Sequence, residues 1–215
     1  MGIKAYILNL GSFKIDKNAF LVSAVQARRD HPTPRLEFID CCNYAVLVDH
    51  PTVGKFLYDL GSNANALTDK WPEELQQVCP YCQNKGEDML SQLALCHTRP
   101  EDIHAVILSH MHWDHTGSMH LFTHCDVYAP IREIEHAMVK IHSTPNLNDH
   151  FPYYKADLEV PVKHLIGVTD EEETIELFPG VHLINLPGHT PGVLGMLLEL
   201  EEGNIVFPSD AAYLA

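Results

Sequence analysis

Basic side chains are scarce in this sequence. Its 215 residues include 14 lysines and arginines against 29 aspartates and glutamates, which gives a formal net charge of −15 at pH 7. A protein that binds the phosphate backbone of a nucleic acid needs a basic face. We therefore predict no nucleic-acid partner. The acidity would also repel anionic ligands, unless bound metal ions reverse the local field.

Long apolar runs are also missing. No stretch approaches the ~18 apolar residues of a membrane-spanning helix, and the N-terminus lacks the basic segment and apolar run of a secretory signal. The sequence thus predicts a cytoplasmic protein with no membrane partner. A chain of this length can bury a substantial core, so we expect a single domain over residues 1–215.

Cysteines are few and unevenly spaced. The six of them do not form a disulfide framework in a chain of 215 residues, so we expect reduced thiols. Cys79 and Cys82 have the spacing of a redox motif, and with the vicinal pair at 41–42 they would complete a thiolate zinc site. Neither function is favoured, because Cys79 does not open a helix after a strand and the vicinal pair is not a CxxC motif.

Short apolar runs bounded by Gly and Pro turns dominate the chain, and two helical patterns interrupt them. Apolar residues recur at helical spacing from Met89 to Cys96 and from Ile131 to Ile141. Residues 142–173 show no regular pattern. A helix followed by a strand with a polar end is typical of α/β folds, which is the predicted class. The predicted strands lie at 5–10, 44–48, 56–60, 105–108, 174–178, 181–186, 193–198 and 204–207.

The most informative motif follows the apolar run at 105–108. Three imidazoles and a carboxylate lie within six residues there, namely His110, His112, Asp114 and His115. In an extended segment alternate side chains point the same way, so His110 and His112 can hold one ion. The turn that follows can direct Asp114 and His115 towards a second ion. We therefore predict a site for two metals at the end of this strand.

Two further strand ends offer ligands. His189 lies in the turn PGHTPG at 187–192, where glycines let the backbone come close and fix the direction of the ring. We expect it to be the third imidazole. Asp210 follows the apolar strand at 204–207, and a carboxylate has two oxygens that can bridge two cations about 3.5–4 Å apart. Taken alone, Asp210 is more simply explained as a turn residue.

In these motifs the chain resembles the metallo-β-lactamase superfamily. In the family's order, the matching residues are Asp59-Leu60-Gly61, the HxHxDH motif at 110–115, GHTPG at 188–192 and Ser209-Asp210. Within the superfamily the chain is most similar to the N-acyl-homoserine lactonases, the quorum-quenching branch. That similarity lies in KAYILNLG at 4–11, Leu108-Ser109-His110 and Asp210-Ala211-Ala212-Tyr213. The resemblance implies an α/β protein with an αββα sandwich.

The resemblance also implies a dinuclear metal centre in which Asp210 and a hydroxide bridge the two ions. Zinc is the expected metal, although iron, cobalt and manganese tolerate the same ligands. Two cations lower the pKa of a shared water to about 7, so a hydroxide nucleophile forms without a protein base. The implied ligands are His110, His112 and His189 for one metal, and Asp114 and His115 for the other.

The implied reaction is the opening of the lactone ring of an N-acyl-homoserine lactone or a similar lactone. By the resemblance, Tyr213 donates a hydrogen bond to the developing oxyanion, and Asp114 carries the proton to the departing alkoxide. Asp59 supports the site without binding a metal. Two stretches, 20–38 and 71–82, have the apolar and aromatic residues to line an acyl pocket.

The chain departs from the family pattern at its C-terminal end. The family has a further His ligand on a strand beyond the bridging Asp, whereas this sequence ends at Ala215, five residues after Asp210. We therefore expect the second half of the sandwich to be incomplete, without its last strands and helix. We also expect the second metal to be bound weakly.

The same motifs leave other functions open. The metal core does not choose among acyl groups, so a thioesterase, an esterase or a β-lactamase-like enzyme is an alternative. A third alternative is a non-catalytic metal-binding relative, or a structural zinc module organised by Cys79 and Cys82. In each catalytic case the partner is a small-molecule ester or lactone.

Overall fold

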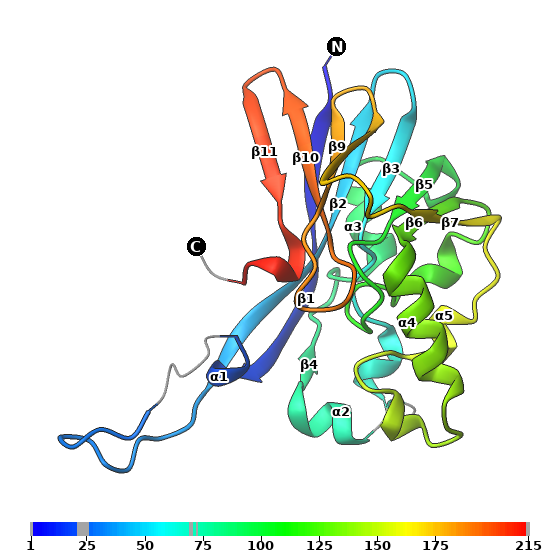
Figure 1. The fold of residues 1–215 in the computed structure, drawn as a ribbon. Coiled ribbons are helices and arrows are strands. Elements are labelled where there is room, and N and C mark those ends of the chain that lie inside the picture. The colour runs from blue at the N-terminus through cyan, green and yellow to red at the C-terminus, as the bar shows by residue number, and fades with distance from the viewer. Residues whose placement is uncertain (1, 21–25, 69–70, 72, 214–215) are drawn as a thin grey trace.

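Two β-sheets form the body of the protein in the computed structural model, which describes residues 2–20, 26–68, 71 and 73–213 (Figure 1). The larger sheet has the strand order β4-β1-β2-β3-β5-β6-β7. Pairs from β4 to β3 are antiparallel, and pairs from β3 to β7 are parallel. Its strands are β1 (Lys4–Asp16), β2 (Phe38–His50), β3 (Gly54–Tyr58), β4 (Tyr81–Cys82), β5 (Ile103–Ile107), β6 (Asp126–Pro130) and β7 (His164–Val168).

The smaller sheet is an antiparallel meander with the order β11-β10-β9-β8, and it confirms the alternating strands predicted for the last third of the chain. Gly180 (φ 73°) and Gly203 (φ 127°) lie at its hairpin turns, where a side chain would strain the backbone. Its strands are β8 (Thr174–Phe178), β9 (Val181–Asn185), β10 (Leu194–Leu200) and β11 (Gly203–Phe207).

The two predicted helices are present, and both lie on the outer face of the large sheet (Figure 1). The Asp88 carboxylate caps α3 by accepting from the Ser91 N–H at 2.9 Å. None of the described helices is long and apolar enough to cross a membrane. The described α-helices are α1 (Lys17–Phe20), α2 (Glu73–Val78), α3 (Met89–Leu95), α4 (Ile131–His142) and α5 (Lys155–Leu158).

Alternating side chains divide the strands of the large sheet between two cores. Leu47 on β2 lies in the core shared with Leu93 of α3 and Ala137 of α4. Its neighbour Val46 lies in the core between the two sheets, with Leu183 and Met196 of the small sheet. All six residues are fully buried. The period of two along a strand therefore supplies an apolar surface on both sides of the large sheet.

Residues 142–173 differ from the irregular stretch that the sequence predicts. They include α5 and also β7, which pairs in parallel with β6. β7 is the edge strand of the sheet and most of its side chains are exposed or half-buried. It therefore lacks the apolar alternation by which a strand with a buried face is recognised.

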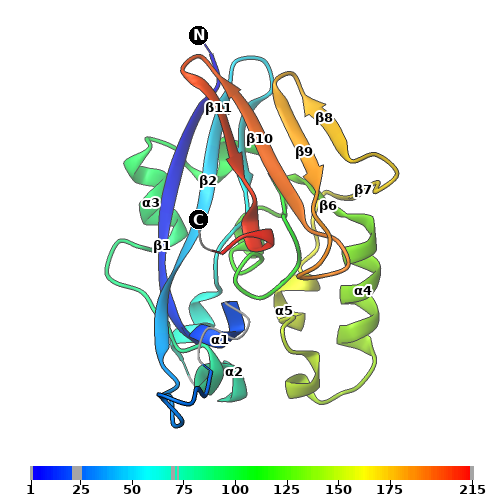
Figure 2. The ribbon, with the colours of Figure 1, turned by 60° about the vertical axis from the view of Figure 1, so that its left-hand side comes forward.

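The layers of the molecule agree with the predicted α/β class and sandwich. The small sheet packs on one face of the large sheet, and α3 and α4 pack on the other (Figure 2). The described residues thus show three layers, αββ. The β1–β2 hairpin extends from this body as an arm whose tip, residues 26–37, has an exposed and irregular backbone.

Candidate metal centre

The loop that follows β5 carries most of the candidate ligands. Two backbone hydrogen bonds hold it against the end of β3. Leu60 N–H donates to the His115 carbonyl at 2.9 Å, and Gly117 N–H donates to the Gly61 carbonyl at 2.7 Å. A Cβ atom on Gly117 would lie 2.0 Å from the backbone nitrogen of Asn63. Only glycine therefore allows the loop to approach β3 this closely.

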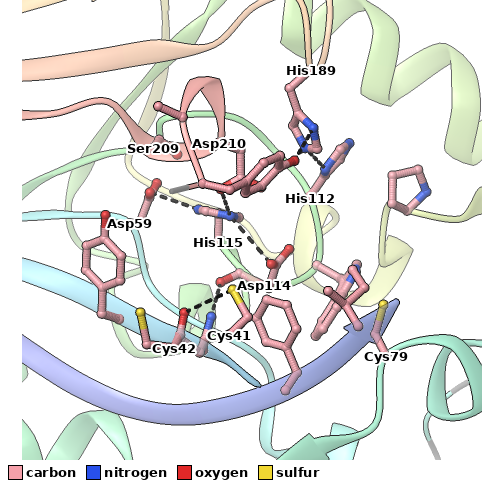
Figure 3. Close-up of a pocket in the computed structure, with 18 of the residues that line it drawn as sticks. Cys41, Cys42, Asp59, Cys79, His112, Asp114, His115, His189, Ser209 and Asp210 are labelled. Carbon is pink, nitrogen blue, oxygen red and sulfur yellow. Dashed lines mark hydrogen bonds and ion pairs between the residues drawn. The ribbon is translucent and has the colours of Figure 1, made fainter. Parts of the chain in front are cut away.

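Three imidazoles converge on one point. The ligand nitrogens of His110, His112 and His189 lie within 4.8 Å of one another. His189 Nε2 and His112 Nδ1 are 2.9 Å apart. His189 reaches this point from the turn between β9 and β10, whereas His110 and His112 follow β5. Figure 3 shows His189 and His112 pointing toward each other. The structure thus brings together the three histidines that were expected to share one metal.

Asp210 lies between two groups of imidazoles. It follows β11 in a short 3-10 helix, η5 (Ser209–Ala211). Its Oδ2 lies 3.3 Å from His189 Nε2 and 3.9 Å from His110 Nε2. Its Oδ1 lies 3.4 Å from His115 Nε2. Each oxygen therefore faces a different side of the cluster, which is the arrangement that a bridging carboxylate requires.

The second group consists of His110, His115 and Asp210, whose ligand atoms lie within 4.8 Å of one another. Asp114 lies beside it, with its Oδ2 3.6 Å from His115 Nε2. The centroid of the His110 ring is 4.5 Å from that of His112 and 4.1 Å from that of His115. His110 therefore stands between both groups, a place that the motif comparison gave to Asp210 alone.

Tyr213 contacts the first group directly. Its hydroxyl lies 2.6 Å from His189 Nδ1, and the two rings meet edge to face at 84°. A phenol oxygen that accepts from Nδ1–H leaves Nε2 with a lone pair that points into the cluster. Tyr213, expected as a catalytic residue, is thus also placed to orient a ligand.

Burial and carboxylates act differently on the histidines. Burial lowers the pKa of His110 well below its usual value, and the neighbouring imidazoles lower it further. Burial acts in the same direction on His112. Both rings are therefore neutral at pH 7, which is the form that binds a metal ion. For His115, burial also disfavours the charge, but nearby carboxylates outweigh it and raise the pKa well above the usual value. They belong to Asp114, Asp59 and Asp210.

One buried nitrogen in the cluster has no hydrogen-bond partner among the described residues. It is Nε2 of His110, a residue with 0% exposure. Leaving a buried polar atom unpaired is costly, and a cation at this point would satisfy its lone pair. Neutral imidazoles together with carboxylate oxygens are a donor set that suits zinc and similar divalent metals. The residues therefore fit a metal centre.

Supporting residues lie behind the ligands. Asp59 acts as expected, because its Oδ2 accepts from His115 Nδ1 at 2.9 Å. Two others were not found from the sequence. Asn43 Nδ2 donates to the Asp114 carbonyl at 2.9 Å, and Glu133 Oε1 accepts from the backbone N–H of Met111 at 3.1 Å. Their separations from the loop along the chain, 71 and 22 residues, leave no local signal.

A cavity of about 290 Å³ opens in front of the cluster. Asp114, His115 and Tyr213 are among the polar residues that line it. Of the two stretches expected to line an acyl pocket, 71–82 contributes Cys79, whereas no described residue of 20–38 lines this cavity. Residues 21–25 of the first stretch lie outside the described residues. Residues 26–37 lie instead on the exposed arm (Figure 1). The apolar or weakly polar side chains of the lining include Phe13, Ile15, Cys79, Trp113 and Phe151.

The cysteines near the cavity belong to neither candidate metal group of the described residues. Burial raises the pKa of Cys41 to about 12, and it does the same for Cys79. Both are therefore protonated thiols at pH 7. Of the two candidate ligand groups found among the described residues, neither contains a cysteine. This disfavours a structural zinc module organised by Cys79 and Cys82.

Known proteins share this arrangement of sheets and motifs. The family model described as the metallo-beta-lactamase superfamily matches residues 42–215, which include every candidate ligand. The chain belongs to the metallo-β-lactamase superfamily. A relative supports this assignment over the whole chain. N-acyl homoserine lactonase AiiB of Rhizobium rhizogenes is 32% identical over 225 residues, which cover 100% of this chain and 79% of the relative.

Solved structures of the superfamily show the same fold. One is Bacillus thuringiensis AiiA, crystallised as a mutant with N-decanoyl-L-homoserine bound at the active site. It matches with a TM-score of 0.75 at 24% identity, over 99% of this chain and 78% of AiiA. Another is AidC, a dizinc quorum-quenching lactonase in complex with a product. It matches with a TM-score of 0.68 at 18% identity, over 98% of this chain and 72% of AidC.

Proposed function

We propose that this protein is a dinuclear metal-dependent hydrolase that opens the lactone ring of N-acyl-homoserine lactones or of a similar lactone. One observation carries the proposal: the two carboxylate oxygens of Asp210 face His189 and His115 at 3.3 and 3.4 Å. The 32% identity to lactonase AiiB over the whole chain supports a lactone as the substrate class. The neighbour with N-decanoyl-L-homoserine at its active site supports it further.

Two metal ions would be held in this cluster. When bound, they would lower the pKa of a shared water to about 7 and polarise a carbonyl oxygen. Zinc is the proposed metal, because its preferred donors are present and because AidC is a dizinc protein. The proposed ligands are His110, His112 and His189 for one ion, and Asp114 and His115 for the other, with Asp210 between them.

The side chains around the ligands carry out the remaining steps. Tyr213 accepts a hydrogen bond from His189 Nδ1–H and directs its own hydroxyl proton to the carbonyl oxygen of the substrate, where negative charge develops. Asp114 lines the cavity beside His115, takes up the proton that the attacking water loses and delivers it to the departing alkoxide oxygen. Water is added across the ester bond, and the product is the open-chain hydroxy acid.

The charge and the cavity agree with a neutral, partly apolar substrate. With a net charge of −15, the surface disfavours nucleic acid as a partner. The apolar part of the cavity lining, with Phe13, Trp113 and Phe151, offers contacts to an acyl chain. We infer that the enzyme acts as a single domain, 1–215, on a small molecule in the cytoplasm.

A substrate panel tests the proposal. The zinc-loaded protein is offered N-acyl-homoserine lactones, thioesters and a β-lactam, and proton release is followed while bound zinc is counted by mass spectrometry. We expect lactones to react fastest. A preference for thioesters or β-lactams would assign the enzyme to another branch. A protein with two bound ions that hydrolyses none of these substrates would refute the proposal.

Histidine variants test whether the candidate metal centre is the site of hydrolysis. Replacing His110 and His112 together by Ala removes two of the proposed ligands, and we expect hydrolysis to fall by roughly a hundredfold or more. The matched control replaces His164 and His182, which pair with the Asp126 and Glu199 carboxylates outside the cluster. The control should keep the parent activity.

A further inference from the structure

A single hydroxyl group joins the two groups of candidate ligands. It belongs to Ser109, which is fully buried between β5 and the histidine loop. Its Oγ lies 2.8 Å from Asp59 Oδ2 and 3.0 Å from His110 Nδ1. It also lies 2.8 Å from the hydroxyl of Ser209, the residue that precedes Asp210. Ser109 therefore contacts the ends of β3, β5 and β11 at once.

The chemistry of these partners determines where each proton lies. The Asp59 carboxylate only accepts hydrogen bonds, so Ser109 donates its proton to Asp59. The lone pairs of Ser109 Oγ then accept from the Ser209 hydroxyl and from His110 Nδ1–H. His110 must therefore carry its proton on Nδ1. This leaves its Nε2 deprotonated, and Nε2 is the buried nitrogen without a partner among the described residues.

The same carboxylate also orients a second imidazole. Asp59 Oδ2 also accepts from His115 Nδ1 at 2.9 Å. His115 Nε2 is thereby directed towards Asp210, at 3.4 Å from its Oδ1. Through Asp59, Ser109 acts on imidazoles of both candidate groups.

Two residues with a strained backbone bond to the hydroxyl of Ser109. Asp59 has a φ of 61° and Ser209 a φ of 50°, both in the left-handed region that side chains disfavour. Each of them bonds to Ser109 through its side chain. Such conformations persist where surrounding contacts hold them, and they cluster at functional sites. The hydroxyl of Ser109 thus fixes the turn after β3 and the turn after β11.

We propose that Ser109 is a positioning residue. Before a metal ion arrives, its hydroxyl sets the tautomer of His110 and docks the turn that carries Asp210 onto the histidine loop. The inference rests on the proposed function, because it treats His110 and Asp210 as ligands. Ser209 contributes to the docking of Asp210, because its hydroxyl donates to Ser109, and no imidazole bond of this hydroxyl is found among the described residues.

The tautomer of His110 tests the first part of the proposal in the metal-free protein. Two-bond ¹H–¹⁵N correlation spectra distinguish an Nδ1–H from an Nε2–H imidazole. We expect the Nδ1–H form in the parent and in Ser209→Ala, and a mixture of both forms in Ser109→Ala. A His110 tautomer that is unchanged in Ser109→Ala would overturn the proposal. The measurement needs neither metal nor substrate, so its result is independent of the proposed function.

Zinc affinity, measured by competition with a chromophoric chelator, tests the second part. We expect Ser109→Ala to weaken binding by about 10- to 100-fold and Ser209→Ala by about tenfold. The matched control is Ser62→Ala, because Ser62 is 6% exposed and its Oγ has no partner among the described residues. The control should bind zinc like the parent. Equal losses in Ser62→Ala and Ser109→Ala would overturn the proposal.

A second variant keeps the proposal testable if Ser109→Ala does not fold. Ser209→Ala then carries the test alone, and an unchanged zinc affinity in it would overturn the docking of Asp210 through Ser109. If the parent binds zinc with this dependence on Ser109 but hydrolyses no lactone, the proposed substrate fails and the positioning role stands.

Discussion

Asp157 illustrates how one buried residue couples the stability of this protein to pH. It lies on α5 with 3% exposure, and its Oδ1 accepts from Asn63 Nδ2 at 2.6 Å. Its Oδ2 has no hydrogen-bond partner among the described residues. Burial raises the pKa of this carboxyl to about 8. In the unfolded chain the value is about 3.9, so the folded protein binds this proton more tightly.

We therefore expect the contribution of Asp157 to the free energy of unfolding to decrease as pH rises from about 4 to about 8. The decrease is at most about 1.4 kcal/mol per pH unit. Asp157→Asn cannot ionise, so the variant should gain stability relative to the parent as pH rises. Urea unfolding of both proteins at pH 5, 7 and 9 measures the difference between their free energies of unfolding. The other titrating groups contribute equally to both proteins, so their effect cancels in this difference. A difference that is constant over this range would contradict the expectation.

The proposed role of Tyr213 in catalysis can be tested directly. Tyr213→Phe removes the hydroxyl that lies 2.6 Å from His189 Nδ1 and that would donate to the oxyanion. Loss of one oxyanion donor lowers kcat by about 10²–10³-fold, and we expect a fall of this size with KM little changed. Steady-state kinetics on a lactone measures it. Tyr128→Phe on β6 is the control, and equal kcat values in both variants would refute the role of Tyr213.

At the scale of elements, the histidine loop depends on its fit against the end of β3. Leu60 and Gly61 bond to the loop backbone at His115 and Gly117. α4 holds the same loop from the other side, because Glu133 Oε1 accepts from the Met111 N–H and from the Tyr153 hydroxyl. The ligand positions are therefore set by β3 and α4 together, and not by the motif itself.

Gly117→Ala tests this fit. The added Cβ would lie 2.0 Å from Asn63 N, so the loop must move, at a cost of about 1–3 kcal/mol. We expect zinc affinity to fall as well, because His115 moves with the loop. The matched control is Gly86→Ala, where a φ of 90° strains the backbone but nothing lies within 4 Å of the new Cβ. Chelator competition should show a loss of affinity only for Gly117→Ala, and the same affinity in both variants would contradict this account.

At the scale of the whole molecule, the candidate metal centre lies where the two sheets meet. The large sheet supplies the ligands that follow β5, and the small sheet supplies His189 and Asp210. Tyr58 on β3 also joins the sheets, since its hydroxyl donates to the Leu194 carbonyl at 2.6 Å. A metal ion bound between these ligands would connect the sheets in addition to their shared core.

Zinc should therefore stabilise the fold. At a free concentration of 100 Kd, a ligand that binds only the folded state adds about 2.7 kcal/mol per site. Thermal unfolding with zinc, and again after addition of a chelator, measures the gain and its reversal. We expect His189→Ala to lose most of the stabilisation by one of the two ions. An equal rise in Tm for this variant and the parent would show that His189 is not a ligand.

Much of this arrangement could be predicted because the signals are local. Alternation of apolar residues identified the meander from β8 to β11, and helical spacing identified α3 and α4. The strand-end position of the HxHxDH motif placed four possible ligands in one loop. Their binding of metal stays a prediction. β7 was missed, since an exposed edge strand carries little periodicity.

By itself the sequence predicted the superfamily, most of the strands and the helices α3 and α4, because periodicity and motif spacing involve residues that are close along the chain. Only the tertiary structure decided that His110 stands between both groups, and that residues 26–37 extend as an arm away from the cavity lining. It alone joined Ser109 to Ser209, which are 100 residues apart. Contacts of this kind depend on how two sheets pack, and no local pattern encodes that packing.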